Sequence, residues 1–534
     1  MILGIDFGTC FSTVAFMIGQ EPRTDGIMRD PDKTGLPTEF LYLNGQELFG
    51  YDCLDGEGGK HRADVIKYMK RTVRENPASL DSTVTSGGKS FTIREVLTKY
   101  LRYLITEARA AAVSANLDNG EIERIAITAP VGIASGQMTS TAYNELLRNV
   151  VAEVSGLPHE KIIVYHEPTA AAVSYIFQNS SKIAANGTQS YLIFDLGGGT
   201  LDVTVVEYDP DTNEYAFMAK AGDLNIGGRN WDEALMNYVR DELGITGAFT
   251  SKEEEAIFER KMIKLKIDLS TLDESMEVFK YNGKNRIAEV TRADFEMVTS
   301  HLLDGAMSVM ARAINEASKN GVDSIDKIVL VGGASNMPMI RERIMAELPF
   351  FDPDNIIYHE PSRAIAKGAA IIAKLDIPPK ERGAAAIGTA PEIKRKEISA
   401  CTYGFDSTNA STNERMIYNL LFKGTQYDEN GRIEVTASTT FIALSDDQKV
   451  LVWNVYETQA YADDCTDGAW LAFGADERAN GMRISVDIPP EYYTKKRSKE
   501  YACTPTFVLD KNGILEFIIK DNKGNVVGYV KEQI

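Results

Sequence analysis

A pattern that occurs in two distant parts of the chain constrains the fold more than any other feature. Near the N-terminus, the apolar run Ile2–Asp6 ends at an acidic residue and is followed by Gly8, Thr9 and a second β-prone run. The same order of apolar run, aspartate, glycine turn and second run returns at residues 191–206. Such a pattern predicts a β-hairpin with an acid at its mouth. The sequence therefore predicts two similar hairpins in two halves of one architecture.

A second pair of similar segments is independent of the hairpins. Residues 164–172 read Val-Tyr-His-Glu-Pro-Thr-Ala-Ala-Ala, and residues 357–364 read Ile-Tyr-His-Glu-Pro-Ser-Arg-Ala. Each is typical of a strand, a turn and a helix that begins with proline. Both pairs keep the same order and are about one domain length apart, which indicates an internal duplication into two lobes with a ligand cleft between them. Helical spacing at residues 92–113 and 253–269 predicts insertions that enlarge the lobes.

The composition excludes several classes of partner. The 534-residue chain has a formal net charge of −20, so nucleic acid would be repelled. The segment after Met1 lacks the basic region and cleavage site of a signal peptide, and the apolar stretches are shorter than the about 20 helical residues that cross a bilayer. The five cysteines are scattered and contain no CxxC pair, which is typical of reduced thiols. We therefore expect a cytoplasmic protein with no membrane partner.

The predicted hairpin turns contain the residues that phosphate binding requires. Glycine lets backbone N–H groups approach phosphate oxygens closely, and the two turns supply Gly8 and residues 197–199. Phosphate-bound Mg²⁺ takes one or two protein carboxylates and keeps several waters, so Asp6 and Asp195 are the candidates, one from each lobe. The chain has neither a P-loop nor a strand-associated GxGxxG, so a nucleotide would be held in another way. Gly332 and Gly333, after the strand at 327–331, form a third glycine element. Their bare backbone offers a surface against which adenine can lie.

The C-terminal part of the sequence has a different character. Residues 377–397 contain a proline pair, an alanine run and a charged stretch, which is typical of a linker. The β-prone runs that follow, separated by turn signals, predict a compact antiparallel sandwich. These runs are residues 441–444, 449–456, 482–488, 506–509 and 513–519.

Taken together, the N-terminal motifs resemble those of the 70-kilodalton heat-shock (DnaK-like) chaperones, within the actin-like superfamily. The motifs are residues 4–9, 127–131, 166–172, 194–202, 222–228 and 331–333, and they keep the family's order over residues 1–376. The resemblance implies an α/β actin-like ATPase of two duplicated, ribonuclease-H-like lobes at 1–376. It further implies, after the linker at 377–397, an all-β sandwich at 398–534 that binds substrate.

The resemblance also implies how a nucleotide would be bound. Asp6 and Asp195 would hold Mg²⁺ through water, and Asp202 would help to place a monovalent cation, for which K⁺ is the candidate. The residues around the phosphates of ATP or ADP would be Gly8, Thr9, Cys10, Gly197, Gly198, Gly199 and Thr200. The residues around adenosine would be Gly228, Lys266, Ser270, Gly333 and Ala334.

The catalytic roles are likewise implied by the resemblance. Lys70 and Glu167 would orient the γ-phosphate and the attacking water, with Asp195 and Thr200 completing the catalytic set. Lys70 is chosen because residues 68–71 (Tyr-Met-Lys-Arg) look like the family's apolar-apolar-Lys-Arg element, and Lys67 is the alternative. Such a set suits phosphoryl transfer, in which metal, lysine and backbone dipoles stabilise spread charge and a carboxylate positions water.

The sequence departs from the family at several positions. Ile263, Asn336 and Ser362 stand where the family has an acidic residue, an arginine and an aspartate, so we expect the contacts to adenine and ribose to be weakened or rearranged. Cys10 replaces a threonine, and a thiol is a weaker donor to phosphate. Residues 407–414 are polar where the family has an apolar peptide cradle, the linker lacks the aliphatic run with an acidic end, and the helical lid is missing.

The resemblance implies an ATP-dependent, chaperone-like protein that slowly hydrolyses ATP to ADP and phosphate and binds extended polypeptide, with co-chaperones as further partners. The departures leave two alternatives open. One is a nucleotide-sensing scaffold that hydrolyses little and uses its C-terminal part for one fixed partner. The other is a small-molecule kinase of the same superfamily, which would need a carboxylate base for a substrate hydroxyl.

Overall fold

The computed structural model describes most of the chain and divides it into two compact units. The described residues are 1–24, 35–114, 120–130, 140–183, 187–212, 214–223, 225–377, 394–396, 398–399, 401–428, 430–458, 460, 462–473, 478–510 and 514–533. Unit 1 comprises Met1–Gly132, Leu146–Glu214 and Ala219–Ile393, and unit 2 comprises Ile133–Glu145, Tyr215–Met218 and Lys394–Ile534. Most of the predicted linker at 377–397 lies outside the described residues, as do Val131 and Leu224 of the quoted motifs.

Unit 1 contains two large sheets that repeat one strand order. The first runs β11-β10-β1-β2-β3, with β1 antiparallel to β2 and parallel to β10. The second begins β18-β17-β12-β13-β14, with β12 antiparallel to β13 and parallel to β17, and residues 215–218 of β14 are assigned to unit 2. The strands are β1 (Ile2–Asp6), β2 (Phe11–Ile18), β3 (Glu21–Arg23), β10 (Arg124–Ala129), β11 (Ile162–His166), β12 (Gln189–Leu196), β13 (Leu201–Asp209), β14 (Glu214–Asp223), β17 (Lys327–Val331) and β18 (Ile356–Tyr358).

Two helices that follow the repeated proline motifs pack together in the middle of unit 1. Helix α5 (Glu167–Ile183) contacts α10 (Ala364–Leu375), and α10 also contacts β1 and β10. The approach of α10 is so close that a Cβ at Gly4 on β1 would overlap the backbone of Ala370. The repeated motifs therefore place their helices back to back, so that the ends of β1 and β12 are held in one unit.

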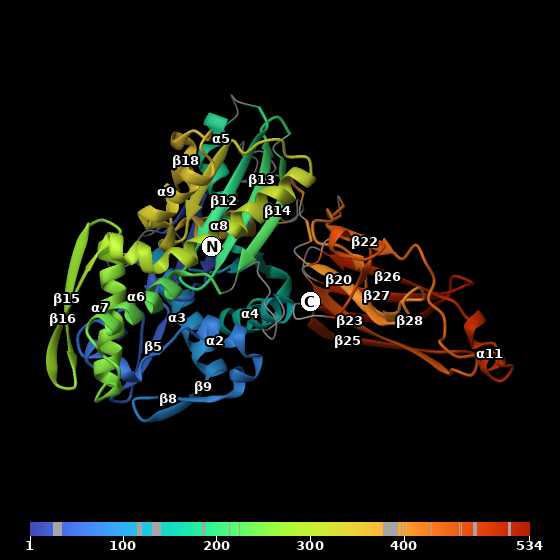
Figure 1. Cartoon of the computed structure of the whole chain (residues 1–534), viewed down its shortest axis with the longest axis horizontal. Helices are drawn as coiled ribbons and strands as arrows, with labels where there is room; N and C mark the ends of the chain where they lie inside the picture. The colour runs from blue at the N-terminus through green and yellow to red at the C-terminus, as the bar shows by residue number, and fades with distance from the viewer. Residues whose placement is uncertain are drawn as a thin grey trace. The chain divides into compact units, whose positions relative to one another are not determined.

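Further helices and small sheets complete unit 1. Helix α3 (Ile93–Ser114) packs on β2 and helix α8 (Arg292–Lys319) packs on β13, while α7 (Lys252–Leu269) contacts the hairpin of β15 (Glu274–Tyr281) and β16 (Lys284–Thr291) (Figure 1). Both predicted helical insertions are thus confirmed by α3 and α7. The remaining elements are α1 (Tyr51–Leu54), α2 (Met69–Glu75), α4 (Ser140–Ser155), α6 (Gly228–Glu242), α9 (Pro338–Glu347), β4 (Leu36–Pro37), β5 (Glu39–Leu43), β6 (Gln46–Phe49), β7 (Ile66–Lys67), β8 (Thr83–Ser86) and β9 (Lys89–Thr92).

Unit 2 is built mainly from two antiparallel sheets. One runs β24-β21-β20-β23-β25 and the other runs β22-β26-β27-β28. Their shared core takes residues from both sheets, with Phe405, Trp453, Phe507 and Phe517 at its centre. The elements are β19 (Lys394–Lys396), β20 (Thr402–Thr408), β21 (Arg415–Leu421), β22 (Arg432–Thr436), β23 (Val450–Thr458), β24 (Trp470–Leu471), β25 (Arg478–Asp487), α11 (Pro490–Tyr493), β26 (Cys503–Asp510), β27 (Ile514–Asp521) and β28 (Val526–Gln533).

One predicted strand of unit 2 is wrong. Residues 441–444 form only an isolated bridge between Phe441 and Cys503. The Gln448 side chain accepts a hydrogen bond from the Leu444 backbone N–H at 2.8 Å, which takes that donor from any neighbouring strand. A side chain that satisfies local backbone in this way favours a turn over a sheet ladder.

Candidate functional site

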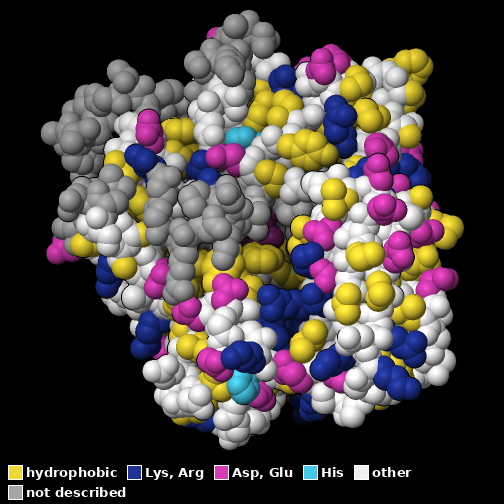
Figure 2. Space-filling model, turned by 90° about the vertical axis from the view of Figure 1, so that its left-hand side faces the viewer, with side chains coloured by type: hydrophobic (Ala, Val, Ile, Leu, Met, Phe, Trp, Pro, Cys, Tyr) yellow, Lys and Arg dark blue, Asp and Glu magenta, His cyan; other side chains and the backbone are white. Residues whose placement is uncertain are grey.

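A cavity of about 810 Å³ in unit 1 contains nearly all of the residues that the sequence indicated. Its walls include Asp6, Gly8, Thr9, Cys10, Lys70, Glu167, Asp195, Gly197, Gly198, Gly199, Thr200, Gly228, Lys266, Ser270, Gly333 and Ala334. Asp202 is not among the lining residues; it is buried beside Asp195, with which it pairs across the β12–β13 hairpin. The face shown in Figure 2 is hollowed near its centre, with Lys and Arg side chains beside the hollow.

The two glycine turns lie against each other in this cavity. A Cβ at Gly198 in the second turn would lie 2.7 Å from the sulfur of Cys10 in the first, and a Cβ at Gly199 would overlap the side chain of Thr9. A side chain at either glycine would force Thr9 or Cys10 to shift, whereas glycine permits the approach as it stands. Two hairpins far apart in sequence therefore present adjoining backbone to the same space.

Helix α6 is anchored on the second turn. The Gly228 N–H donates to the Gly197 carbonyl at 2.9 Å, and the Arg229 N–H donates to the Gly198 carbonyl at 2.8 Å. The N-terminus of a helix carries partial positive charge and favours bound anions. The anchor therefore places a favourable dipole at the glycine turn.

Carboxylates cluster at the ends of β1 and β12, where Asp6 is partly buried and Asp195 is buried. Burial, with a further contribution from Glu167, raises the pKa of Asp6 to about 7, and burial together with Glu167 raises the pKa of Asp195 well above its usual range. The Oδ2 atom of Asp195 is buried without a hydrogen-bond partner among the described residues. Both observations indicate a site short of positive charge.

A hydrated divalent cation fits this site. Among the described residues, no group of three or more His, Cys, Asp or Glu side chains is arranged to bind a metal directly. Mg²⁺ bound to phosphate needs only one or two protein carboxylates, because water and phosphate complete its coordination. Asp6 and Asp195 satisfy that smaller requirement.

Lys70 and Glu167 form a buried ion pair in the cavity wall. Lys70 comes from α2 and Glu167 is the first residue of α5, and their side chains are 4% and 8% exposed. Lys67, the alternative catalytic lysine, instead pairs with Glu259 on α7. Tyr68, between the two lysines, has a left-handed backbone (φ 61°) at the start of α2, and Lys70 on that helix lines the cavity.

The wall predicted to contact adenosine comes from α7 and from the turn after β17. Lys266 forms an ion pair of 2.7 Å with Asp232 and donates to the Gly228 carbonyl at 3.0 Å. Gly332 has a left-handed backbone (φ 80°) that a side chain would strain, and it turns the chain toward Gly333 and Ala334. The wall is therefore held by buried charge as well as by backbone geometry.

Of the three positions where we expected altered contacts to adenine and ribose, two line the cavity. Asn336 and Ser362 are in its wall, together with the apolar residues Ile267, Met337 and Ile365. Apolar side chains can pack on the faces of a flat base. The wall thus differs in chemistry from the family pattern at the positions expected from the sequence.

The structure adds residues that the motifs did not indicate. Arg229 lines the cavity, stacks on the Tyr68 ring at 3.9 Å and forms an ion pair of 3.2 Å with Glu259. Asp232 also lines the cavity, one helical turn after Gly228. The sequence offered one signal for Asp232, an aspartate one helical turn after Gly228. It offered none for Arg229, whose contacts depend on tertiary structure.

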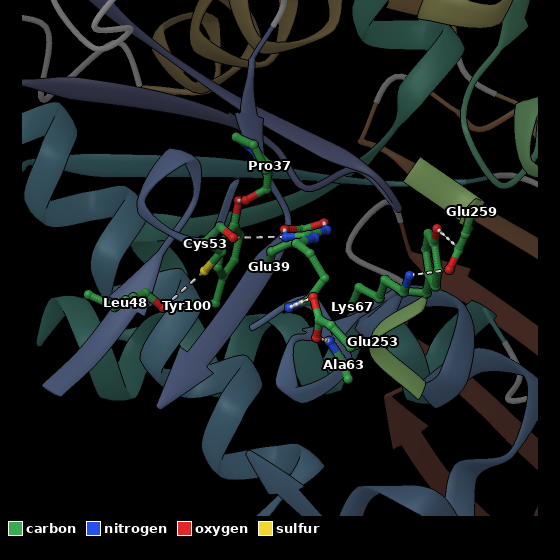
Figure 3. Close-up of polar contacts among 11 residues, drawn as sticks. Pro37, Glu39, Leu48, Cys53, Ala63, Lys67, Tyr100, Glu253 and Glu259 are labelled. Atoms are coloured by element: carbon green, nitrogen blue, oxygen red, sulfur yellow. Dashed lines mark hydrogen bonds and ion pairs between the residues drawn. The ribbon is translucent and has the colours of Figure 1, made fainter. Parts of the chain in front are cut away.

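Helix α7 is tied to the segment before α2 at two points (Figure 3). The Glu253 carboxylate accepts hydrogen bonds from the backbone N–H groups of Arg62 at 3.1 Å and Ala63 at 2.9 Å. Glu259, further along the helix, pairs with Lys67 and accepts from the Tyr68 hydroxyl at 2.8 Å. Glu259 also pairs with Arg229, which lines the cavity, so the second of these points lies beside the cavity wall.

Comparison with known proteins agrees with this site. The family described as Hsp70 protein matches residues 60–388 of the chain. The chain belongs to the Hsp70 family. This Hsp70 sequence is 26% identical over 542 residues to the chaperone protein DnaK of Mesomycoplasma hyopneumoniae, with 98% of the chain and 77% of that relative covered. It is 25% identical over 539 residues to the chaperone protein DnaK of Mycoplasma mobile, with the same shares covered.

The resemblance drawn from the sequence motifs is thereby confirmed, and the Hsp70 match gives the chain an ATP-dependent, chaperone-like function. The structure shows mixed α/β architecture with several sheets. Among the described helices, we find no apolar stretch of the length and composition that a bilayer crossing requires.

Proposed function

We propose that the chain binds ATP and ADP with Mg²⁺ in the cavity of unit 1 and slowly hydrolyses ATP to ADP and phosphate. The observation that supports this best is the pair of glycine turns that adjoin in the cavity lined by the partly buried Asp6 and the buried Asp195. Adjoining backbone dipoles and uncompensated carboxylates suit a triphosphate and its divalent cation.

The individual roles are those that the family resemblance implies, and the contacts in the cavity support them. Asp6 and Asp195 hold Mg²⁺ through water, and Asp202 behind them helps to place K⁺. When bound, Mg²⁺ neutralises charge on the phosphates. The Glu167 carboxylate orients the attacking water, while the Lys70 ammonium, already paired with Glu167, contacts the γ-phosphate. Backbone and hydroxyl groups from Thr9, Cys10, Gly197, Gly198, Gly199 and Thr200 surround the phosphates.

The adenosine moiety lies against the wall formed by α7 and the turn after β17. The residues that contact it are Gly228, Lys266, Ser270, Gly333 and Ala334. The buried pair of Lys266 and Asp232 fixes the lysine, so that its aliphatic stem is available to the nucleoside.

We also propose the finer fold assignment. The shared strand order of the two large sheets supports an actin-like ATPase with duplicated lobes at 1–376. The two antiparallel sheets with one core support a β-sandwich at 398–534, joined by the linker at 377–397.

For partners, we propose extended polypeptide bound by unit 2, co-chaperones, and a cytoplasmic location. The names of the DnaK relatives support the chaperone role, and β22 and β28 are end strands to which an extended segment can add. The scaffold alternative is favoured by the loop after β20, which closes on itself: Asn409 N–H donates to the Glu414 carbonyl at 2.9 Å, and Asn413 N–H donates to the Asn409 carbonyl at 2.8 Å. Such a loop has fewer backbone groups to offer a peptide.

Ligand-induced stabilisation tests the nucleotide proposal. A ligand that binds only the folded state raises its stability by RT ln(1 + [L]/Kd), about 2.7 kcal/mol at 100 times Kd. We expect Mg-ATP and Mg-ADP to raise the melting temperature of the full chain, and GTP to raise it less. The variant Asp195→Asn should lose the dependence on Mg²⁺. An unchanged melting temperature at millimolar nucleotide would overturn the proposal.

A second experiment, peptide-array binding with and without ATP, separates a chaperone from a scaffold with one fixed partner.

A further inference from the structure

A buried cluster of hydroxyl groups lies behind the first glycine turn, outside the set of residues that would contact the nucleotide. It comprises Ser12, Thr38 and Tyr100, all of which are at most 1% exposed. Thr38 stands between β4 and β5, and β4 pairs with β2 directly after the turn. The cluster therefore sits where it can act on the turn without contacting the ligand.

Thr38 holds the turn through two carbonyl groups. Its hydroxyl donates to the Gly8 carbonyl at 2.9 Å, and its backbone N–H donates to the Cys10 carbonyl at 2.8 Å. Because a hydroxyl has one proton, the 2.8 Å contact between the Ser12 and Thr38 hydroxyls is donated by Ser12. The Thr38 hydroxyl is thus oriented, with its single donor committed to Gly8.

The orientation of these carbonyls decides where the neighbouring N–H groups point. In a planar trans peptide, the C=O and the following N–H point in opposite directions. When Thr38 takes the carbonyls of Gly8 and Cys10, the N–H groups of Thr9 and Phe11 are turned away from Thr38. Thr9 and Phe11 both line the cavity.

Tyr100 holds Thr38 in place from α3. Its hydroxyl lies within hydrogen-bond distance of the Pro37 carbonyl at 2.8 Å (Figure 3). The Leu36 carbonyl lies 3.2 Å from the same hydroxyl. The residue before Thr38 is therefore held by a side chain of α3. The support runs from α3 through the β4 segment to the turn itself.

We infer that Thr38, supported by Tyr100, is a positioning residue that pre-orients the backbone N–H groups of the first turn for the phosphates of the nucleotide. This inference rests on the proposed nucleotide function. A turn that is already oriented does not have to lose conformational freedom when the ligand binds. Loss of this pre-orientation should therefore weaken the binding of the phosphates, which the turn contacts, and leave the binding of the nucleoside unchanged. Adenosine has no phosphate, so its affinity should not depend on Thr38.

The test compares ADP with adenosine on the full chain in the presence of Mg²⁺. Thr38→Val keeps the shape of the side chain and removes the hydroxyl, and we expect ADP affinity to fall about tenfold with adenosine affinity unchanged. Thr38→Ser restores the donor and should restore ADP affinity. Tyr100→Phe should act in the same direction with a smaller effect, because it acts through Thr38.

Thr299→Val is the matched control for a general loss of stability. Thr299 is fully buried in α8, and its hydroxyl donates to the Phe295 carbonyl at 2.7 Å. This variant should lower the melting temperature and leave the ratio of ADP to adenosine affinity unchanged.

Two outcomes would overturn the inference while the proposed function stands: an unchanged ratio in Thr38→Val, or equal losses for ADP and adenosine. A ratio that stays low in Thr38→Ser would also overturn it, because the donor is restored there. A wild-type chain that binds neither ligand contradicts the proposed function itself, and the inference falls with it.

Discussion

Removing the ammonium of Lys70 should affect stability and hydrolysis in separable ways. The Lys70–Glu167 pair is buried, with side chains 4% and 8% exposed. Removing one partner of a buried pair leaves an uncompensated charge and costs about 3–5 kcal/mol, whereas replacing both partners is often nearly neutral. Lys70→Met should therefore destabilise unit 1 by roughly that amount. The double variant Lys70→Met/Glu167→Gln should recover most of the loss.

Hydrolysis should not recover with stability. If Lys70 contacts the γ-phosphate and Glu167 orients water, each single variant should slow single-turnover hydrolysis by at least about tenfold, or 1.4 kcal/mol of barrier. The double variant should be as slow as the slower single variant, because the two groups act as a unit.

The assay compares four proteins: the wild type, Lys70→Met, Glu167→Gln and the double variant. Urea denaturation, read by hydrogen exchange in peptides from β1 and β12, reports the stability of unit 1 separately from unit 2. Single-turnover hydrolysis is measured below the denaturation range of every variant. Lys67→Met is the matched control: its partner Glu259 retains Arg229 and Tyr68, so we expect a small effect on both quantities. Wild-type hydrolysis by Lys70→Met would refute the catalytic role, and fast hydrolysis by Lys70→Met with slow hydrolysis by Lys67→Met would transfer the role to Lys67.

Three further predictions address other parts of unit 1. Burial raises the pKa of the Cys10 thiol to about 11, so iodoacetamide should label it slowly at neutral pH and faster as pH rises, and saturating Mg-ADP should protect it; mass spectrometry showing equal labelling with and without nucleotide would remove Cys10 from the site. Burial lowers the pKa of His359 from 6.5 to about 4, so its contribution to stability is fully present above pH 6.5 and is lost as pH falls through 4. In urea titrations, the free energy of unfolding of the wild type should fall by roughly 3 kcal/mol more than that of His359→Gln over this range. Parallel pH profiles of the unfolding free energy for the two proteins would contradict this. Gly4→Ala should lower the melting temperature of unit 1 by at least several degrees, because the added Cβ overlaps the backbone of Ala370, and an unchanged melting temperature would show that α10 can move away.

The local features of this Hsp70 family member could be read from the sequence alone. The two hairpins, their acidic ends and their glycine turns occur where the residue pattern predicted them. Helices α3 and α7 match the predicted insertions within a residue or two at each end. Strand alternation, helical spacing and turn chemistry act over a few residues, so the information for them is contained in short segments.

The sequence was less reliable where a side chain chose between local and distant partners. The expected strand at 441–444 gave way to a turn because Gln448 satisfied the backbone of Leu444. Position 70 and position 67 offered the same residue type, and of the two it is Lys70, after a left-handed backbone at Tyr68, that lines the cavity. No pattern of residue types predicts that backbone conformation at a tyrosine, which rarely adopts it.

Only the tertiary structure decided the pairings on which the site depends. The contacts of Lys70 with Glu167, Lys266 with Asp232 and Thr38 with the first turn join segments that are distant along the chain. Each requires two elements to be packed at a defined distance and angle, and that packing is the sum of many weak contacts rather than a property of either segment. The sequence by itself thus determined which residues were available at the mouths of the two hairpins, and long-range packing determined which partners met there.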